Sequence, residues 1–379
     1  MSFIRKFLFA PRESTFGPIV RVLKYICVWR PNSSRKKTIL FYSHLTFDII
    51  YSLNLTLNLI LNYEFYLFLN FVNYSAFFLS PTKISQYAYS SKKWKVLVDL
   101  VEGLEEDSTR ERDSECTKII TRHRVYSHLV LIGFWGACLP IVVFMFICYW
   151  FKDIIIYGDE PVEDIRYIFK ALLPFDQNTI KGRYLSATLQ TFFGFISPVH
   201  TLCWDSLALA SMVFLVGQLK ALKVRCINAL DCEDEETRWR NLLTCYHMHV
   251  RILKYIFISY MDRYLGLHRL ENVADVCVNN CILFDFAILR STCHSLIALL
   301  LFYWIANEVT VQSLNLSYGV FESNWVSDSK RIRCAVFIMG MGMTRRIAFN
   351  AGPFNEMSLA TFIGVGYNDQ DFLEDCYYN

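Results

Sequence analysis

A stretch of about 25 residues, from Ser127 to Phe151, contains no charged side chain. A helix needs about 20 apolar residues to cross the hydrocarbon core of a bilayer, so this stretch predicts a membrane-spanning helix. Pro140 lies near its middle and predicts a kink. Only 19% of the whole chain is charged, against about 25% in soluble domains. We therefore expect an all-α membrane protein whose main surroundings are lipid.

Further apolar stretches bring the expected number of transmembrane helices to seven. The third of them is the stretch described above. The fifth is short and is interrupted by polar residues, and the seventh is a short apolar re-entry. The other predicted spans are Ile39–Leu61, Phe65–Leu79 (ended by Ser80 and Pro81), Ala187–Leu219, Val276–Leu289, Ser291–Ile305 and residues 351–366.

Basic residues in the segments between these spans predict the orientation. Residues 1–38, 82–126 and 220–275 each contain nine Lys or Arg, whereas residues 152–186 contain five and are net acidic. Lys and Arg accumulate on the cytoplasmic side of a membrane. The sequence therefore predicts an intracellular N-terminus and an extracellular C-terminus, with the helical segment of residues 306–350 on the cytoplasmic side.

Two polar features of the sequence leave alternatives open. Asp48 lies inside the first span, where an ionised carboxyl is costly and must face other helices. It is either a pocket or relay residue, or a buried Asp bonded to a neighbouring helix, and we favour the second interpretation. The acidic run at Asp231 and 233–236 is either a solvated loop or a partner-binding segment, and we favour the loop.

Several functional classes find no support in the sequence. The thirteen cysteines include no CxxC pair, and neither Cys277 with Cys281 nor Cys245 with His247 and His249 completes a four-ligand set. We expect neither a metal nor another cofactor. There is no HExxH, Walker or GxSxG motif, so we expect no enzyme. A net charge of +3 is too small to indicate a nucleic-acid partner.

A series of short motifs follows in a defined order along the chain. They are Leu173–Asp176 (LPFD), Tyr184–Gln190, Gly217–Leu222 (GQLKAL), His249–Leu253, Asn307–Glu308, Ser323–Trp325, Ala351–Gly352 and Met357–Phe362. Their combination resembles the insect odorant receptor family, over about residues 40–362. A gustatory receptor would end in TYxxxxxQF, which is absent. Asp262-Arg263-Tyr264 is similar to the DRY motif of G-protein-coupled receptors, but it lies before the fifth span, and the predicted orientation is the opposite one.

The resemblance implies a function and an organisation. It implies a ligand-tuning subunit of an odorant-gated, non-selective cation channel, a hetero-tetramer with the odorant receptor co-receptor, in the plasma membrane of olfactory sensory neurons. The expected partners are that co-receptor, volatile hydrophobic odorants and the lipid bilayer. The expected regions are a cytoplasmic arm (1–38), a six-helix ligand-binding bundle (39–305), anchor helices (306–350) and a pore-lining seventh helix with a divergent tail (351–379).

The resemblance also places the odorant in the outer half of the bundle, between spans two, three, four and six. A volatile ligand offers few hydrogen bonds, so its site must be apolar and aromatic. Side chains of this kind at helical spacing are otherwise core residues. The candidate ligand-binding residues are Phe65, Phe68, Phe71, Leu139, Val143, Phe146, Tyr149, Leu189, Phe192, Phe193, Ile196, Leu296, Leu300 and Tyr303.

Two departures from the family pattern lead to an alternative function. The region of the fifth and sixth spans is shorter than in the family, and residues 368–374 contain charged and amide side chains that do not suit a lipid-crossing helix. We hypothesise that the tail is divergent and that this subunit supplies an incomplete pore wall. The alternatives are therefore a non-conducting or degenerate receptor of the same family, then a G-protein-coupled or gustatory receptor or a transporter.

Overall fold

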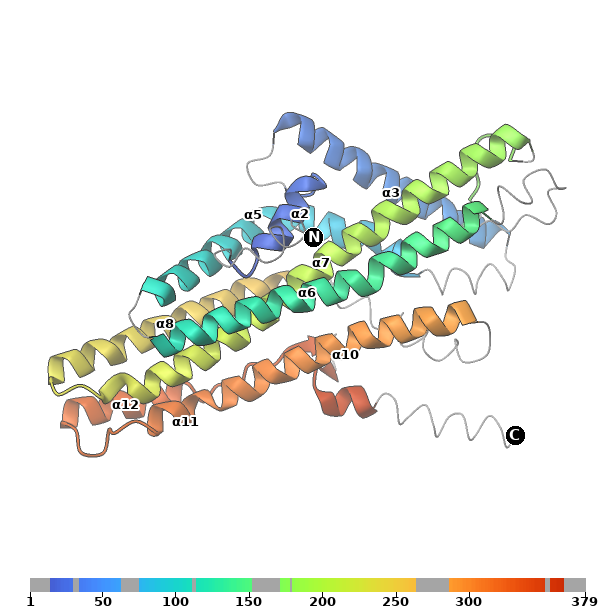
Figure 1. Ribbon diagram of the computed structural model, residues 1–379. Coiled ribbons are helices and arrows are strands. Elements are labelled where there is room, and N and C mark those ends of the chain that lie inside the picture. Colours follow the sequence, from blue (N-terminus) through green and yellow to red (C-terminus); the bar gives the residue numbers. More distant parts are fainter. Residues whose placement is uncertain are drawn as a thin grey trace, which may run out of the picture.

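The structure is a computed structural model of the 379-residue chain, and it describes residues 14–29, 34–62, 75–110, 114–151, 171–177, 179–263, 286–351 and 355–364. Nearly all of them are helical (Figure 1). The elements are α2 (Gly17–Tyr25), α3 (Arg35–Leu61), α5 (Ser75–Arg110), α6 (Ser114–Tyr149), α7 (Ile180–Ile227), η3 (Asn228–Leu230), α8 (Glu235–Arg263), α10 (Phe286–Leu314), α11 (Leu316–Phe321), α12 (Lys330–Gly342), β1 (Asn350–Ala351) and β2 (Asn355–Glu356).

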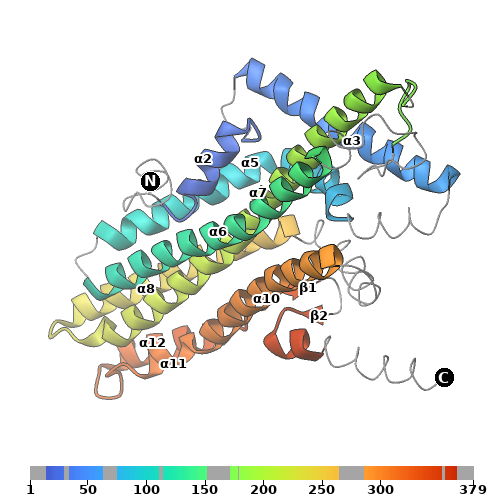
Figure 2. The same ribbon diagram turned by 45° about the vertical axis from the view of Figure 1, so that its right-hand side comes forward.

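Helix α7 is the centre of the bundle. It contacts α2, α3, α5, α6, α8, α10 and α11. In its most apolar window 78% of the residues are buried, against 33% in α3 and 25% in α6. The main core forms around it, with Leu207, Leu215 and Leu222 fully buried. Both views show α6 and α10 running alongside α7, while α3 crosses its outer end (Figures 1 and 2).

Three helices in the described part of the chain are long and apolar enough to cross a membrane, namely α3, most of α6, and α7 with its short extension. Exposed side chains on α3 are also apolar, including Ile50 at 61% and Leu53 at 64% exposure. A helix that is apolar on all sides is typical of a membrane span. Ser34 and Thr179 cap α3 and α7 by accepting the backbone N–H groups of Lys37 and Gly182.

The segments predicted to be cytoplasmic gather at one end of the bundle. The C-terminal ends of α5 and α7, the start of α6, and α8, α11 and α12 all lie at the lower left of Figure 1. Apolar side chains from residues 82–126 are buried there, among them Trp94, Leu97 and Val101. Helix α2 packs near this end of the bundle through Ile19 and Leu23, together with the preceding Phe16. The backbone N–H of Thr15, also before α2, donates to Glu105 at 3.2 Å.

Several helices run beyond the predicted spans. The second span was predicted to end at Ser80 and Pro81, and α5 continues as a helix through Pro81 to Arg110, because the segment after Pro81 has an apolar face to bury. Helix α7 begins at Ile180 rather than Ala187, and α10 runs without a break from Phe286 to Leu314. The acidic run is only partly a loop, because α8 begins at Glu235. The second span's residues 65–74 and most of the fifth span lie outside the described residues.

The chain turns back after α12. Strands β1 and β2 pair antiparallel, with Asn350 opposite Glu356, and the backbone N–H of Met357 donates to Phe349 O at 2.8 Å. Residues 359–364 are helical. The ring of Phe362 lies 5.8 Å from that of Tyr303, which connects this last segment to α10. The predicted divergent tail lies outside the described residues.

Candidate functional site in the outer half

A second, smaller group of buried residues lies apart from the main core. It consists of Tyr51 and Leu55 of α3, Phe146 of α6, Ala171 of the following loop and Phe193 of α7. We call these residues the outer cluster. Each is less than 6% exposed. Because the outer cluster combines helices that are distant in sequence, it depends on the tertiary fold.

Aromatic rings connect α3 to α7 in this region. The rings of Tyr51 and Phe193 are 4.6 Å apart, and those of Phe47 and Phe192 are 5.0 Å apart in an edge-to-face arrangement. Phe47 also stacks on Tyr51 at 5.7 Å. Such aromatic pairs contribute about 0.5–1.5 kcal/mol beyond their buried area. The result is an apolar, aromatic wall of the kind that binds small hydrophobic molecules.

The loop before α7 covers the outer cluster. The side-chain amide of Asn54 in α3 donates to Leu172 O at 2.5 Å and accepts from Leu172 N at 2.7 Å. Gln177 donates to Ala171 O at 2.8 Å, which closes the loop on itself. A side chain at Gly182 would meet Asp176 O at 2.0 Å, so α7 starts close against this loop. Thus the LPFD motif lies in a loop fixed to both α3 and α7.

A polar layer lies beneath the aromatic wall. Asp48 of α3 is fully buried, and its Oδ2 accepts from Ser80 of α5 at 3.1 Å and contacts His200 Nδ1 of α7 at 3.2 Å. As predicted, this buried acid bonds to neighbouring helices. One turn further along α7, Asp205 pairs with Lys83 of α5 at 2.8 Å. Asp48 and Asp205 therefore each contact a basic side chain of a neighbouring helix.

The structure brings together some of the predicted ligand-binding residues and separates others. Phe146, Phe193 and the half-buried Leu189 meet in the outer cluster, and Phe192 joins the aromatic wall at 46% exposure. Ile196 is half-buried. The remaining predicted residues lie elsewhere: Leu139 and Tyr303 pack in the main core, Val143 and Leu300 are exposed, and Phe65, Phe68, Phe71 and the side chains of Tyr149 and Leu296 lie outside the described residues.

Sequence reasoning missed the contribution of α3. Phe47, Tyr51 and Leu55 follow each other at intervals of four on one helix face, beside the buried Asp48. This spacing, together with an acid that must face other helices, was a signal that the first span borders the site.

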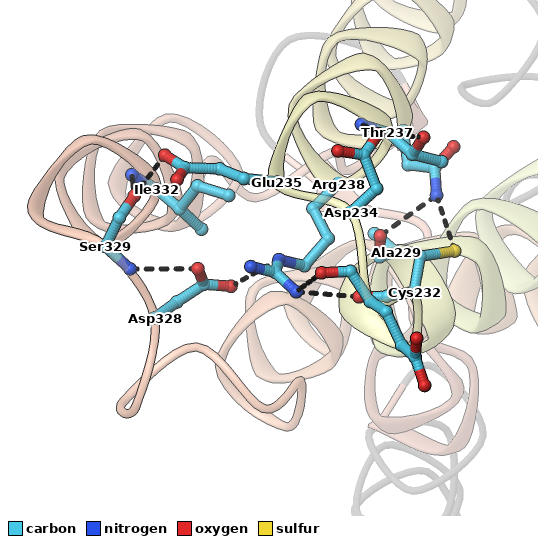
Figure 3. Close-up of polar contacts among 11 residues, drawn as sticks. Ala229, Cys232, Asp234, Glu235, Thr237, Arg238, Asp328, Ser329 and Ile332 are labelled. Carbon is cyan, nitrogen blue, oxygen red and sulfur yellow. Dashed lines mark hydrogen bonds and ion pairs between the residues drawn. The ribbon is translucent and has the colours of Figure 1, made fainter.

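A second polar assembly fixes the end of the bundle that is predicted to be cytoplasmic (Figure 3). Arg238 of α8 donates to Cys232 O at 2.7 Å and Glu233 O at 2.9 Å, and it forms an ion pair with Asp328 at 3.0 Å. Asp328 also accepts from Ser329 N, and Ser329 Oγ donates to Glu235 at 2.6 Å. We call these contacts the cytoplasmic clamp. They join the loop before α12 to the start of α8.

Caps strengthen this clamp. Ser329 caps α12, and Asp234 caps α8 by accepting from the backbone and the hydroxyl of Thr237 at 2.9 and 2.6 Å. The hydrogen bonds from the Thr237 side chain and backbone hold the pKa of Asp234 below its usual range. Part of the acidic run therefore has a structural role, which the loop interpretation did not include.

Two of the sequence motifs meet at α7. Lys220 of the GQLK stretch pairs with Glu308 of α10 at 2.7 Å, and Lys223 pairs with Glu322, just after α11, at 3.6 Å. Gly217 lets α7 pass close to α6, because a Cβ there would lie 2.9 Å from His123. These motifs join the membrane bundle to the cytoplasmic helices.

Comparisons with known proteins place the chain in a family. Residues 66–366 match the family described as the 7tm odorant receptor, and since this is most of the chain, the chain belongs to that family. It has the all-helical, seven-transmembrane fold of an odorant-gated channel family that is not enzymatic, and it is a multi-pass membrane protein. A comparison with curated protein sequences gave no match.

Two solved structures have a similar fold. The structure of the insect olfactory receptor OR5 from Machilis hrabei has a TM-score of 0.76 at 16% sequence identity, covering 93% of this chain and 95% of that chain. The structure of the same receptor in complex with eugenol has a TM-score of 0.72 at 16% identity, covering 100% and 99%.

Proposed function

We propose that this chain is the ligand-tuning subunit of an odorant-gated cation channel that it forms with the odorant receptor co-receptor. The observation that carries this proposal is the outer cluster, a loop-covered group of aromatic and aliphatic side chains separate from the main core. A relative of the same fold has been solved with eugenol, a volatile aromatic molecule. A volatile hydrophobic odorant would therefore bind here against Phe146, Leu189 and Phe193.

The cytoplasmic helices would carry the binding signal to the assembled channel. The clamp between α8 and α12 and the pair Lys220–Glu308 fix these helices to α7. In the predicted orientation, with the N-terminus inside, they form the anchor region of residues 306–350. Their exposed apolar side chains, such as Ile338 at 72% and Phe337 at 57% exposure, would contact neighbouring subunits of the hetero-tetramer.

A current recording tests the proposal. The chain is expressed in oocytes with an insect odorant receptor co-receptor, and a panel of esters, alcohols, aldehydes and terpenes is applied. We expect inward currents that require this chain and are absent with the co-receptor alone. Silence at confirmed surface delivery would contradict the tuning role for these odorants.

The sequence of the tail supports one alternative, a non-conducting receptor. Residues 368–374 contain charged and amide side chains where a pore helix would be apolar. Replacing the residues after Phe362 with an ordinary family tail distinguishes the two. If the graft restores current to a silent chain, the native pore is incomplete and the ligand site is intact.

A further inference from the structure

The buried carboxylate of Asp48 is only half satisfied. Both of its polar contacts, from Ser80 Oγ and His200 Nδ1, reach the same oxygen, Oδ2. The other oxygen, Oδ1, is buried, and no hydrogen-bond donor in the described part of the chain reaches it. A buried acceptor without a donor is costly, and a membrane interior supplies no water to replace the donor. Asp48 Oδ1 is therefore an acceptor that a bound molecule with a hydrogen-bond donor would satisfy.

The surroundings of Asp48 indicate what could provide that donor. Phe47 and Tyr51, next to it on α3, belong to the aromatic wall with Phe192 and Phe193 of α7. A molecule with an apolar body and one polar group would place the body against these rings and the group at Oδ1. Two other polar groups in the same zone, Ser52 Oγ and Thr201 Oγ1, are also buried without a described partner.

The partly exposed side of the wall gives a direction of approach. Phe192 is 46% exposed, and half-buried His44 lies with its ring 6.2 Å from Phe192 and 6.4 Å from His200. The His44 ring therefore lies next to both the exposed Phe192 and the buried His200. The neighbouring acid, Asp205, has its own partner in Lys83 at 2.8 Å. Among the described residues, Asp48 is thus the carboxylate of this layer with a buried oxygen that no donor reaches.

We propose that Asp48 Oδ1 is a hydrogen-bonding subsite that selects odorants with a hydroxyl donor over matched molecules without one. This inference rests on the proposed function, because it specifies the ligand class of the outer cluster. A hydroxyl donates to Oδ1, whereas an ether oxygen of the same skeleton has no proton to donate. Hydrogen bonds to charged groups are strong enough to change affinity about tenfold or more.

Matched odorant pairs test the subsite. The probes are hexanol, octanol and phenylethanol, each with its methyl ether, applied to the chain co-expressed with the co-receptor. We expect each alcohol to be at least about tenfold more potent than its ether. In Asp48→Asn, an amide nitrogen stands in place of Oδ1. It donates to the oxygen of the alcohol and to that of the ether alike, so the potency ratio of alcohol to ether falls to about one. Ser80→Ala removes only a contact to Oδ2 and keeps the alcohol preference.

The outcomes separate the two proposals. Equal potency of alcohols and ethers in the native chain, or an unchanged ratio in Asp48→Asn, overturns the subsite while the odorant currents still support the proposed function. Absence of every chain-dependent current at confirmed surface delivery contradicts both. If Asp48→Asn fails to reach the membrane, Asp48→Glu keeps the charge but displaces the oxygen. A parallel loss of alcohol and ether potency in that variant also overturns the subsite.

Discussion

In the outer half, α3, α6 and α7 meet through aromatic rings such as those of Tyr51 and Phe193. In the cytoplasmic half, α7, α8 and α12 meet through the main core and through ion pairs such as Arg238–Asp328. Ring contacts tolerate small changes in distance and angle. Capped helices and paired charges require particular partners at fixed distances. The difference agrees with the proposed function, in which the outer end binds ligands and the other end contacts neighbouring subunits.

The largest expected effect tests the cytoplasmic side of this comparison. Arg238→Ala leaves Asp328, whose side chain is 5% exposed, without its counter-charge. Removing one partner of a buried pair costs about 3–5 kcal/mol, so we expect a loss of about 3 kcal/mol and dissociation of the assembled channel. Thermal unfolding in detergent and size-exclusion chromatography measure the two effects.

Arg331→Ala is the matched control. Arg331 pairs with Glu236 at 3.9 Å with both side chains more than half exposed, and it lies over the Trp239 ring at 4.1 Å. Exposed contacts of these kinds contribute about 1 kcal/mol or less each. Equal losses in the two variants would show that the clamp has no special role.

The second prediction compares two glycines. A Cβ at Gly194 would lie 1.9 Å from the Phe146 ring, and one at Gly340 would lie 2.3 Å from the Phe321 ring. Phe146 is 2% exposed, but Phe321 is 37% exposed and can move outward. We expect Gly194→Ala to cost about 1–3 kcal/mol and to reduce odorant potency. Gly340→Ala should change stability by less than about 1 kcal/mol, because higher helix propensity offsets the contact.

Concentration–response curves and unfolding midpoints of the two glycine variants check this prediction. The assembled channel should persist in both, since neither substitution touches the cytoplasmic clamp. If Gly340→Ala is the more damaging, the cytoplasmic helices are packed more tightly than the outer cluster, and the comparison is reversed.

The smallest expected effect is a pH dependence at Glu105. Burial raises the pKa of this carboxyl above 4.5, although Arg124 and Thr15 act in the opposite direction. The folded protein therefore holds the proton more tightly than the unfolded chain. This contribution to stability is full at pH values below the ordinary pKa and is lost as pH rises from 4.5 through the raised pKa.

Glu105→Gln removes this titration while it keeps an acceptor for Thr15. Thermal unfolding at a series of pH values from acidic to neutral compares it with the native chain. We expect the unfolding temperature of the variant to fall less steeply with rising pH over that range than that of the native chain. Identical slopes would show that Glu105 does not titrate in that range.

Hydropathy predicted the described spans well because the cost of placing charge in lipid acts on each helix separately. It did not predict how far each helix extends. Pro81 is tolerated inside α5 because the helix beyond it buries Ile84, Tyr87 and Trp94. The ligand site was likewise predicted only in part, because its residues are brought together by packing between helices. Phe146 and Phe193 were candidates because the resemblance placed the ligand between their helices and their side chains are apolar. Leu139 and Tyr303 met the same criteria but pack in the main core.

The sequence by itself determined that this chain is a helical membrane protein of the odorant receptor family, because apolar spans, basic segments and ordered motifs are local properties. Only the tertiary structure decided which aromatic residues meet. Tyr51 and Phe193, or Asn54 and Leu172, are more than a hundred residues apart. Their contacts depend on the angle at which α3 crosses α7, and side-chain packing between helices sets that angle.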